Sequence, residues 1–334
     1  MVIVDATRIA ASAADRQTRS CERIAAEILG EAAAIDAAED ERYGEARGDE
    51  LPPGFGNQGD RRTRLREAKQ ALDAERAAQA KKIPRDRRER LHECRRRLYE
   101  DWALERRVVV DHAAWLAAGI ASDGSRRMTG ARHDIKPYPL SERPAGKINL
   151  TDPDARTLKS PRGWVLGYNA QAVVTDAQII IAAEIDTANI DRANLQPMMQ
   201  TACDELRAAG GDRTPEVVIA DAGYRKTEAI EALVARGIQT LVAPDADRRN
   251  EPSPNRRGRL YDFMRRVLAA DHGSQLYARR QAVIEPIFGQ IKHNRRADRF
   301  QRRGRSAARS EWRLLAATHN ILKLWRHNTA AATA

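Results

Sequence analysis

The run Val217–Ala220 limits the possible folds more than any other stretch of this chain. Its four residues, VVIA, are all apolar and three of them are β-branched, and Asp221 follows directly. A continuous apolar run of this length is typical of a strand covered on both faces, because successive side chains point to opposite sides of the sheet. The run therefore predicts a sheet between layers of helices, with an acidic side chain at the end of a central strand.

The segments around this run alternate between strand and helix patterns. Apolar and alternating runs bounded by turn residues predict strands, and apolar residues three and four apart predict helices. The short run VIVD near the start adds one more strand, so the expected fold is an α/β domain with a mixed sheet flanked by helices. The expected strands are residues 2–5, 163–175, 178–187, 217–220 and 238–244, and the helices between them are residues 195–206 and 227–237.

The segment between the first two of these strands is different in character. It is highly charged, and pairs of apolar residues recur every seven positions, at Ile28 and Ile35 and again at Leu65 and Leu72. This period predicts a short coiled-coil-like helical hairpin. After Pro84 a basic helix continues. Solvated helix faces are the plainest interpretation of this segment, and a DNA-tracking or dimerising arm is the alternative.

The charge balance indicates the kind of partner. The chain has 334 residues and carries 58 Lys and Arg against 47 Asp and Glu, a formal net charge of +11. This excess favours an anionic partner, with nucleic acid ahead of an anionic membrane surface. The sequence contains no apolar run of spanning length and no signal peptide, and its three scattered cysteines are typical of reduced thiols. These features predict a cytoplasmic protein without a membrane partner.

Three acidic residues are candidates for chemistry. Asp5 ends VIVD, Asp221 ends VVIAD, and Glu285 lies beside the apolar face of a helix in QAVIEPIFGQIKHNRR. Carboxylates that converge at strand ends repel one another unless a cation lies between them, and Mg²⁺ prefers oxygen ligands. Two such ions can activate an attacking oxygen and stabilise a leaving oxygen in phosphoryl transfer. Each residue also has a structural interpretation, as a turn-former or as an acid at a helix start.

A basic segment follows Glu285. Lys292 is seven residues after Glu285, which places both on one side of a helix, where Lys292 can hold a phosphate beside the acids. A solvated face is the alternative to DNA-backbone contact for the arginines that follow. The apolar residues between Trp312 and Trp325 predict an amphipathic closing helix with its tryptophans in the core. The arginines singled out are Arg295, Arg296, Arg302 and Arg303.

Four blocks in order carry a resemblance to a known family. TDPDAR, GYNAQAVV, ADAGY and IEPIFGQIKHNRRADRFQRRGR together resemble the DDE-type transposases of bacterial insertion sequences, and VDATRIAAS resembles the family's first-aspartate segment. The resemblance covers about residues 149–326 and the first dozen residues. It implies an RNase H-like domain in which two aspartates and a glutamate bind two divalent metal ions, Mg²⁺ or Mn²⁺. It also implies cleavage of transposon ends and joining of the freed 3′-OH to target DNA.

By motif, the resemblance assigns catalytic and metal-binding roles to Asp5, Asp221 and Glu285. Asp152 in TDPDAR is the rival first aspartate, and Asp5 is preferred because INLTDPD is less strand-like and is broken by Pro153. The family's tyrosine–arginine–glutamate–lysine signature has its counterpart in four residues. The gap between its arginine and its glutamate is one residue longer here than in the commonest form, which leaves Arg279 as a rival for the arginine. The four residues are Tyr277, Arg280, Glu285 and Lys292.

The resemblance also sets expectations for the whole chain. Double-stranded DNA is the expected partner, a homodimer the expected assembly, and the cytoplasm, in association with the nucleoid, the expected location. The family usually carries a DNA-binding domain ahead of the first aspartate, so a start so near Asp5 predicts a truncated and inactive enzyme. The alternative is a non-catalytic DNA-binding or dimerising remnant that modulates a full-length relative.

The expected domains follow from these assignments. The first strand and the later strands belong to one RNase H-like catalytic domain, and the charged helical segment is inserted between its first and second strands. The expected limits are 1–14 for the first strand, 15–140 for the insertion, 141–326 for the remainder of the catalytic domain and 327–334 for a disordered tail.

Overall fold

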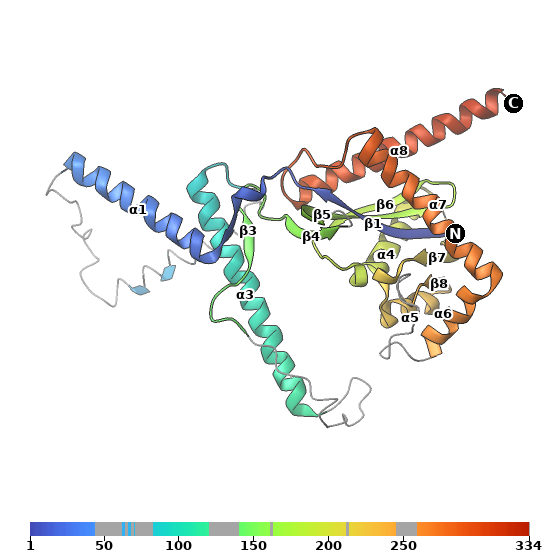
Figure 1. Ribbon diagram of the computed structural model, residues 1–334, viewed down its shortest axis with the longest axis horizontal. Coiled ribbons are helices and arrows are strands. Elements are labelled where there is room, and N and C mark those ends of the chain that lie inside the picture. The colour runs from blue at the N-terminus through green and yellow to red at the C-terminus, as the bar shows by residue number, and fades with distance from the viewer. Residues whose placement is uncertain are drawn as a thin grey trace. The chain divides into compact units, whose positions relative to one another are not determined.

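The chain forms two compact units in a computed structural model (Figure 1). The sheet unit comprises Met1–Ala13 with Asp154–Ala334, and the helical unit comprises Ala14–Pro153. Residues 141–153, which the sequence assigned to the catalytic domain, group with the helical unit. The residues described are 1–43, 62, 63, 66, 67, 70, 83–119, 140–160, 163–211, 214–244 and 259–333.

A mixed sheet forms the centre of the sheet unit. The strand order is β4-β5-β1-β7-β8, and β6 also pairs with β5. The first strand, β1, lies in the interior, antiparallel to β5 and parallel to β7, and β7 is parallel to β8. The strands are β1 (Val2–Ala10), β4 (Arg156–Ser160), β5 (Gly163–Thr175), β6 (Ile180–Asp186), β7 (Val217–Ala220) and β8 (Gln239–Val242).

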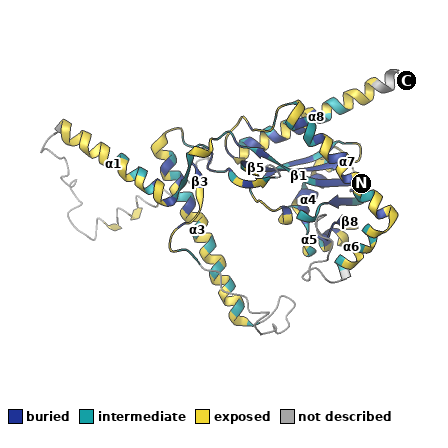
Figure 2. Ribbon diagram, viewed as in Figure 1, coloured by how far each residue is buried: buried dark blue, intermediate teal, exposed yellow. Residues whose placement is uncertain are grey.

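Helices cover both faces of this sheet, so that alternate residues of β1 enter different cores. Val2 and Val4 pack with α4 and α5, whereas Ile3 and Ile9 pack with α7 and α8. Burial on both faces explains the continuous apolar run of β7 (Figure 2). The helices are α4 (Leu195–Ala208), α5 (Thr227–Ala235), α6 (Arg259–Ala269), α7 (Asp271–Gly289) and α8 (Arg305–Thr333), with short turns η2 (Asp191–Ala193), η3 (Ala222–Tyr224) and η5 (Gln290–Asn294).

The helical unit has a small core of its own. Its strands β2 and β3 pair antiparallel, and side chains from α1, α3 and β3 pack together, among them Ile24, Leu91 and Ile148. In α3 the described buried side chains are confined to the stretch from Leu91 to Leu98. The elements are η1 (Asp15–Gln17), β2 (Thr18–Ser20), α1 (Cys21–Tyr43), α3 (Arg87–Ala118) and β3 (Lys147–Asn149).

The α/β prediction is confirmed, and several local predictions need correction. Residues 163–175 and 217–220 are strands as expected. The tail from residue 327 was expected to be disordered, but α8 continues to Thr333, because alanine is the best helix former. Trp312 is buried as predicted, whereas Trp325 is 62% exposed, so its assignment to the core was wrong.

Two sequence predictions lie wholly or partly outside the described residues. The apolar positions Leu65 and Leu72 of the seven-residue repeat lie outside the described residues. So does the second half of the proposed helical hairpin, apart from residues 62, 63, 66, 67 and 70. Among the helices that the structure describes, none has the length and apolar character needed to cross a membrane.

Candidate active site

Asp5 and Asp221 lie at adjacent positions of neighbouring strands. In the parallel pairing of β1 with β7, Val4 is opposite Ala220, and the two aspartates are the next residues of each chain segment. Asp221 has extended backbone angles, and its Oδ1 accepts a hydrogen bond of 2.8 Å from the Gly223 N–H. Because parallel strands in register direct neighbouring side chains to the same face, this arrangement brings the two carboxylates together.

Burial and mutual repulsion make both carboxyl groups hard to ionise. Burial raises the pKa of Asp5 to about 7, although the Arg280 guanidinium lowers it, and the nearby charges of Asp221 and Asp191 raise it further. The pKa of Asp221 is also raised, first by burial, while the Gly223 N–H and Arg280 act in the opposite direction. Burial therefore disfavours the ionised form of both aspartates, a cost that a bound cation would offset.

Two basic side chains from the segment after the sheet lie against β1. Arg280, a buried residue of α7, forms an ion pair of 2.7 Å from Nη1 to Asp5 Oδ2, and its guanidinium carbon is 5.5 Å from the centre of the Tyr277 ring. Lys292 donates from Nζ to Thr7 Oγ1 at 3.0 Å and to the Arg8 carbonyl at 2.9 Å. Asp5 and Thr7 point to the same face of β1, so both cations lie on the side covered by α7.

Asp191 is an acidic neighbour that the sequence analysis missed. This buried residue of η2 accepts hydrogen bonds of 2.6 Å from both the Asn169 and Gln171 side-chain amides. Gln171 in turn accepts a hydrogen bond of 2.5 Å from the Tyr224 hydroxyl, in the turn after Asp221. Burial, and next the charge of Asp191, raise the pKa of Tyr224 well above its usual range. The network thus braces the turn that carries Asp221.

A sequence signal for this network existed in β5. Asn169 and Gln171 are polar residues that alternate with apolar ones in the run GYNAQAVV, and both are buried. Buried amides need hydrogen-bond partners, which predicts a polar group against this face of the strand. Nothing in the sequence NIDRAN itself distinguishes Asp191 from an ordinary loop acid.

Glu285 does not lie on the buried side of its helix. It is exposed, whereas Arg280, Ile284 and Ile287 of α7 are buried. Glu285 is five positions after Arg280, so the two side chains point about 140° apart around a regular helix. Among the residues that the structure describes, no three His, Cys, Asp or Glu side chains gather so that they could hold a metal ion. Of the three predicted residues, Asp5 and Asp221 lie at adjacent strand positions, and Glu285 lies on the exposed side of α7.

Pro286 lies inside α7, and the helix continues to Gly289. A π-helical segment, η5, follows directly and carries Lys292. Wider π turns rotate the side chains that follow them, so Lys292 need not share the face of Glu285 that an unbroken α-helix would give it.

The other predicted DNA-binding residues divide into two groups. Arg295 donates to Thr318 Oγ1 at 2.7 Å, and Arg303 donates from Nε to the Ser12 carbonyl at 3.1 Å. Arg296 and Arg302 are exposed, and within the described part of the chain their side chains form no hydrogen bond or ion pair. Arg296 also has a positive φ of 55°. Asp152, the rival first aspartate, is fully buried and belongs to the helical unit.

The fold class defined here is a mixed α/β sheet flanked by helices, with two aspartates at adjacent strand positions. Residues 127–321 match the family described as the transposase DDE domain. The chain therefore belongs to this family, and its sheet unit is an RNase H-like domain. The matched range contains Asp152, Asp221 and Glu285, and Asp5 lies outside it. The comparisons with curated proteins and with solved structures gave no match.

The two aspartates fit a divalent cation. They supply hard carboxylate oxygens, and burial, which raises the pKa of Asp5, disfavours its ionised form unless a cation is bound beside it. Glu285, on the exposed side of α7, does not complete a ligand set in this conformation. The residues present thus fit one ion shared by Asp5 and Asp221.

Proposed function

We propose that this chain is a transposase that cleaves DNA strands and transfers the cut strand to target DNA. Transposases of this family act on DNA, generally with divalent metal ions, and the observation that carries the proposal is the pairing of Asp5 with Asp221 across β1 and β7. The net charge of +11 supports a polyanionic substrate. The homodimer and the cytoplasmic, nucleoid-associated location expected from the resemblance are part of the same proposal.

In this proposal Asp5 and Asp221 hold a divalent ion, and Glu285 joins them where two ions are bound. When bound, such ions activate the attacking oxygen and stabilise the leaving oxygen of the scissile phosphodiester. Two cationic side chains and one tyrosine of the protein contact the substrate, which is the role expected for Arg280, Lys292 and Tyr277. Arg280 also neutralises part of the charge on Asp5 through their 2.7 Å ion pair. The hydrogen bond from Gly223 orients Asp221.

Strand cleavage tests this function directly. The substrate is duplex DNA that carries the sequences on either side of the gene, incubated with the full chain and Mg²⁺ or Mn²⁺. We expect nicks and joined products that require the metal, and at least a thousandfold loss in Asp221→Asn, because a metal-binding carboxylate is removed. Undiminished cleavage by Asp221→Asn would rule the assignment out.

One set of observations favours a second function. Glu285 is exposed, the described residues assemble no three-ligand metal site, and Arg280 is paired with Asp5. A chain that stays in this arrangement binds DNA without cutting it, as expected of a regulatory remnant. Salt-sensitive DNA binding, with no cleavage in either metal, would favour this second function.

A further inference from the structure

One face of α3, in the helical unit, carries a line of basic and aromatic side chains. Its members recur at intervals of four, three, four and seven residues, which keeps them within about 60° around the helix and extends the line over about 27 Å. All five are exposed, Tyr99 to 41%. We call this the α3 stripe: Arg88, His92, Arg95, Tyr99 and Arg106.

The arginines of the α3 stripe differ from two other arginines of the same helix. Arg96 and Arg97 are both ion-paired with Glu93 at 2.7 Å, in the i, i+3 and i, i+4 arrangement that stabilises a solvated helix. Within the part of the chain that the structure describes, Arg88, Arg95 and Arg106 form no ion pair. No acidic residue falls within the stripe, and the acids of α3 lie on its other sides.

Aromatic rings support two of these guanidinium groups. The Arg95 guanidinium carbon lies 5.8 Å from the centre of the Tyr99 ring, and that of Arg106 lies 5.0 Å from the centre of the Trp102 ring. Trp102 is fixed by a hydrogen bond of 2.9 Å from its indole N–H to the Ser141 carbonyl. Cation–π contacts restrict the arginine side chains, which reduces the entropy lost when they bind a ligand.

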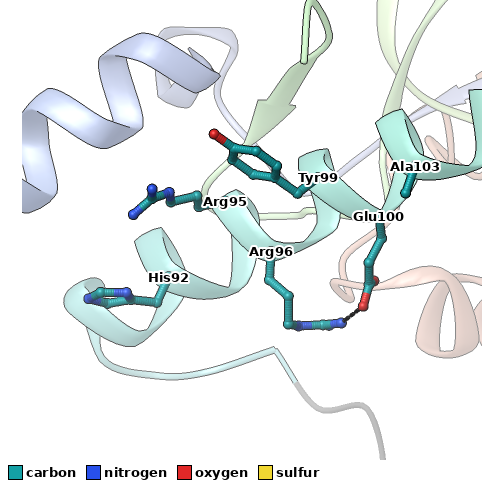
Figure 3. A pocket seen from close by; sticks show the side chains of 6 residues that line it. All are labelled: His92, Arg95, Arg96, Tyr99, Glu100 and Ala103. Carbon is teal, nitrogen blue, oxygen red and sulfur yellow. Dashed lines mark hydrogen bonds and ion pairs between the residues drawn. The ribbon is translucent and has the colours of Figure 1, made fainter. Parts of the chain in front are cut away.

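The centre of the stripe borders an open hollow (Figure 3). Its volume is about 580 Å³, and the acid that lines it, Glu100, is ion-paired with Arg96. Figure 3 shows Arg95 and His92 projecting away from that pair. A hollow that is open and cationic suits an extended polyanion better than an enclosed small molecule. The lining residues are His92, Arg95, Arg96, Tyr99, Glu100 and Ala103.

We propose that the α3 stripe binds the sugar–phosphate backbone of duplex DNA, in addition to the contacts made near the candidate active site. The inference rests on the proposed function for the presence of a DNA substrate. Arg88 and Arg95 are about 10 Å apart along the helix, and Arg95 and Arg106 about 16 Å. Each strand of a duplex offers a phosphate about every 3.4 Å of its axis but winds around that axis, so the stripe would meet the two backbones that border a groove. Such contacts hold the DNA without reading its sequence.

Salt-dependent DNA binding tests the stripe in the full chain without added metal. The variant Arg88→Gln, Arg95→Gln, Arg106→Gln removes three positive charges from it. The matched control, Arg107→Gln, Arg207→Gln, Arg236→Gln, removes three from exposed positions outside the stripe. We expect the stripe variant to bind a labelled duplex about tenfold more weakly and to lower the slope of log K against log salt by about one per arginine. The control should stay near the wild-type values.

A photo-crosslinking residue gives a second readout that does not depend on net charge. Placed at Tyr99, in the stripe, it should crosslink to the labelled duplex. Placed at Leu104, which is 58% exposed on another side of α3, it should not. Equal effects of the two triple variants, or equal crosslinking from the two positions, would overturn the proposal. Because wild-type binding is measured without cleavage, either outcome leaves the test of strand cleavage unaffected.

Discussion

At the scale of single residues, the site is organised by the charge balance around Asp5. Its carboxylate is buried beside Asp221 and near Asp191, and Arg280 is the basic side chain paired with it. The sequence left Arg279 and Arg280 as alternatives for the arginine of the signature. Arg280 is buried against Asp5, whereas Arg279 is exposed, so the structure favours Arg280 as the residue tied to the site.

Replacing Arg280 tests this charge balance. Arg280→Gln leaves the Asp5 carboxyl without its paired cation. Because the pKa of Asp5 is already about 7, this carboxyl can take up a proton at pH 7, so we expect the free energy of unfolding to fall by only about 1 kcal/mol there and by more as the pH rises. Adding Asp5→Asn removes the uncompensated charge and should restore most of the loss. Denaturant unfolding of the four members of this cycle measures the coupling. Arg279→Gln is the control, expected within about 0.5 kcal/mol of wild type. Additive effects of the two substitutions would contradict a direct ion pair.

Gly223 gives a second prediction at this scale. A Cβ at this position would lie 2.9 Å from Asp221 Oδ1 and 3.5 Å from Asp191 Oδ2. Gly223→Ala should therefore displace the Asp221 carboxylate and lower strand cleavage at least tenfold, in the same assay as above, because such a site tolerates only small displacements. Gly30→Ala, in the open interior of α1, should leave cleavage unchanged. Full cleavage by Gly223→Ala would show that the orientation of Asp221 is not critical.

Asp5 and Asp221 could be singled out from their apolar runs, and Arg280 and Lys292 from the family signature, whereas Asp191 and the orientation of Glu285 could not be predicted. Asp221 directly follows the apolar run that forms β7, as predicted. Asp5 was expected to end its strand, but β1 continues to Ala10, so the short run VIVD predicted the strand and not its last residue. Asp191 belongs to a short turn without periodicity, and its position depends on hydrogen bonds to Asn169 and Gln171 from another strand. Glu285 was predicted at the edge of a buried helix face. In the structure Arg280 and Ile284 are on the buried face of α7, and Glu285 is exposed to solvent.

At the scale of elements, α8 is held to the sheet by an ion-pair cluster on β6. Glu184 accepts from Arg309 at 2.6 Å and from Arg313 at 2.5 Å. Burial alone would raise the pKa of Glu184, but the hydrogen bonds from Arg309 and Arg313 outweigh it and lower this pKa below its usual value. The cluster thus links the closing helix to strand β6.

This cluster predicts a pH dependence of stability. Because the pKa of Glu184 is lower in the folded chain, its stabilisation is fully present above about pH 4.3, the unfolded value, and is lost as the pH falls through the folded pKa. Glu184→Gln should lower the free energy of unfolding by about 1 kcal/mol at pH 7, and the difference should shrink below pH 4. Thermal unfolding between pH 7 and pH 3 measures it, with Glu231→Gln, on the exposed side of α5, as the control. A difference that persists at pH 3 would contradict this account.

The sequence predicted where the strands lie along the chain better than it predicted which strands pair with each other. The runs at residues 163–175 and 217–220 give strand positions directly, because apolar periodicity is local. That β1 lies between β5 and β7 depends on contacts between segments more than 150 residues apart, such as Asp5 with Ala172. The two-stranded sheet of β2 and β3 was not predicted either, since each strand has only three residues.

At the scale of the whole molecule, two groups of exposed arginines stand out among the residues that the structure describes. One is the segment after α7, where Arg296 and Arg302 are exposed, and the other is the α3 stripe. The family assignment covers residues 127–321 and thus includes the first location but not the second. A duplex bound at both should show a steeper salt dependence than one bound at either alone.

Divalent-metal binding tests the central claim, that Asp5 and Asp221 form the metal-binding pair of a transposase. Mn²⁺ titrated into the full chain, and into Asp5→Asn, Asp221→Asn and Asp152→Asn variants shown to be folded, is followed by calorimetry or by the Mn²⁺ resonance signal. We predict that the wild-type chain and Asp152→Asn bind Mn²⁺ alike, and that Asp5→Asn and Asp221→Asn bind at least tenfold more weakly, since each loses a carboxylate ligand. Wild-type affinity in Asp5→Asn, together with its loss in Asp152→Asn, would contradict the account.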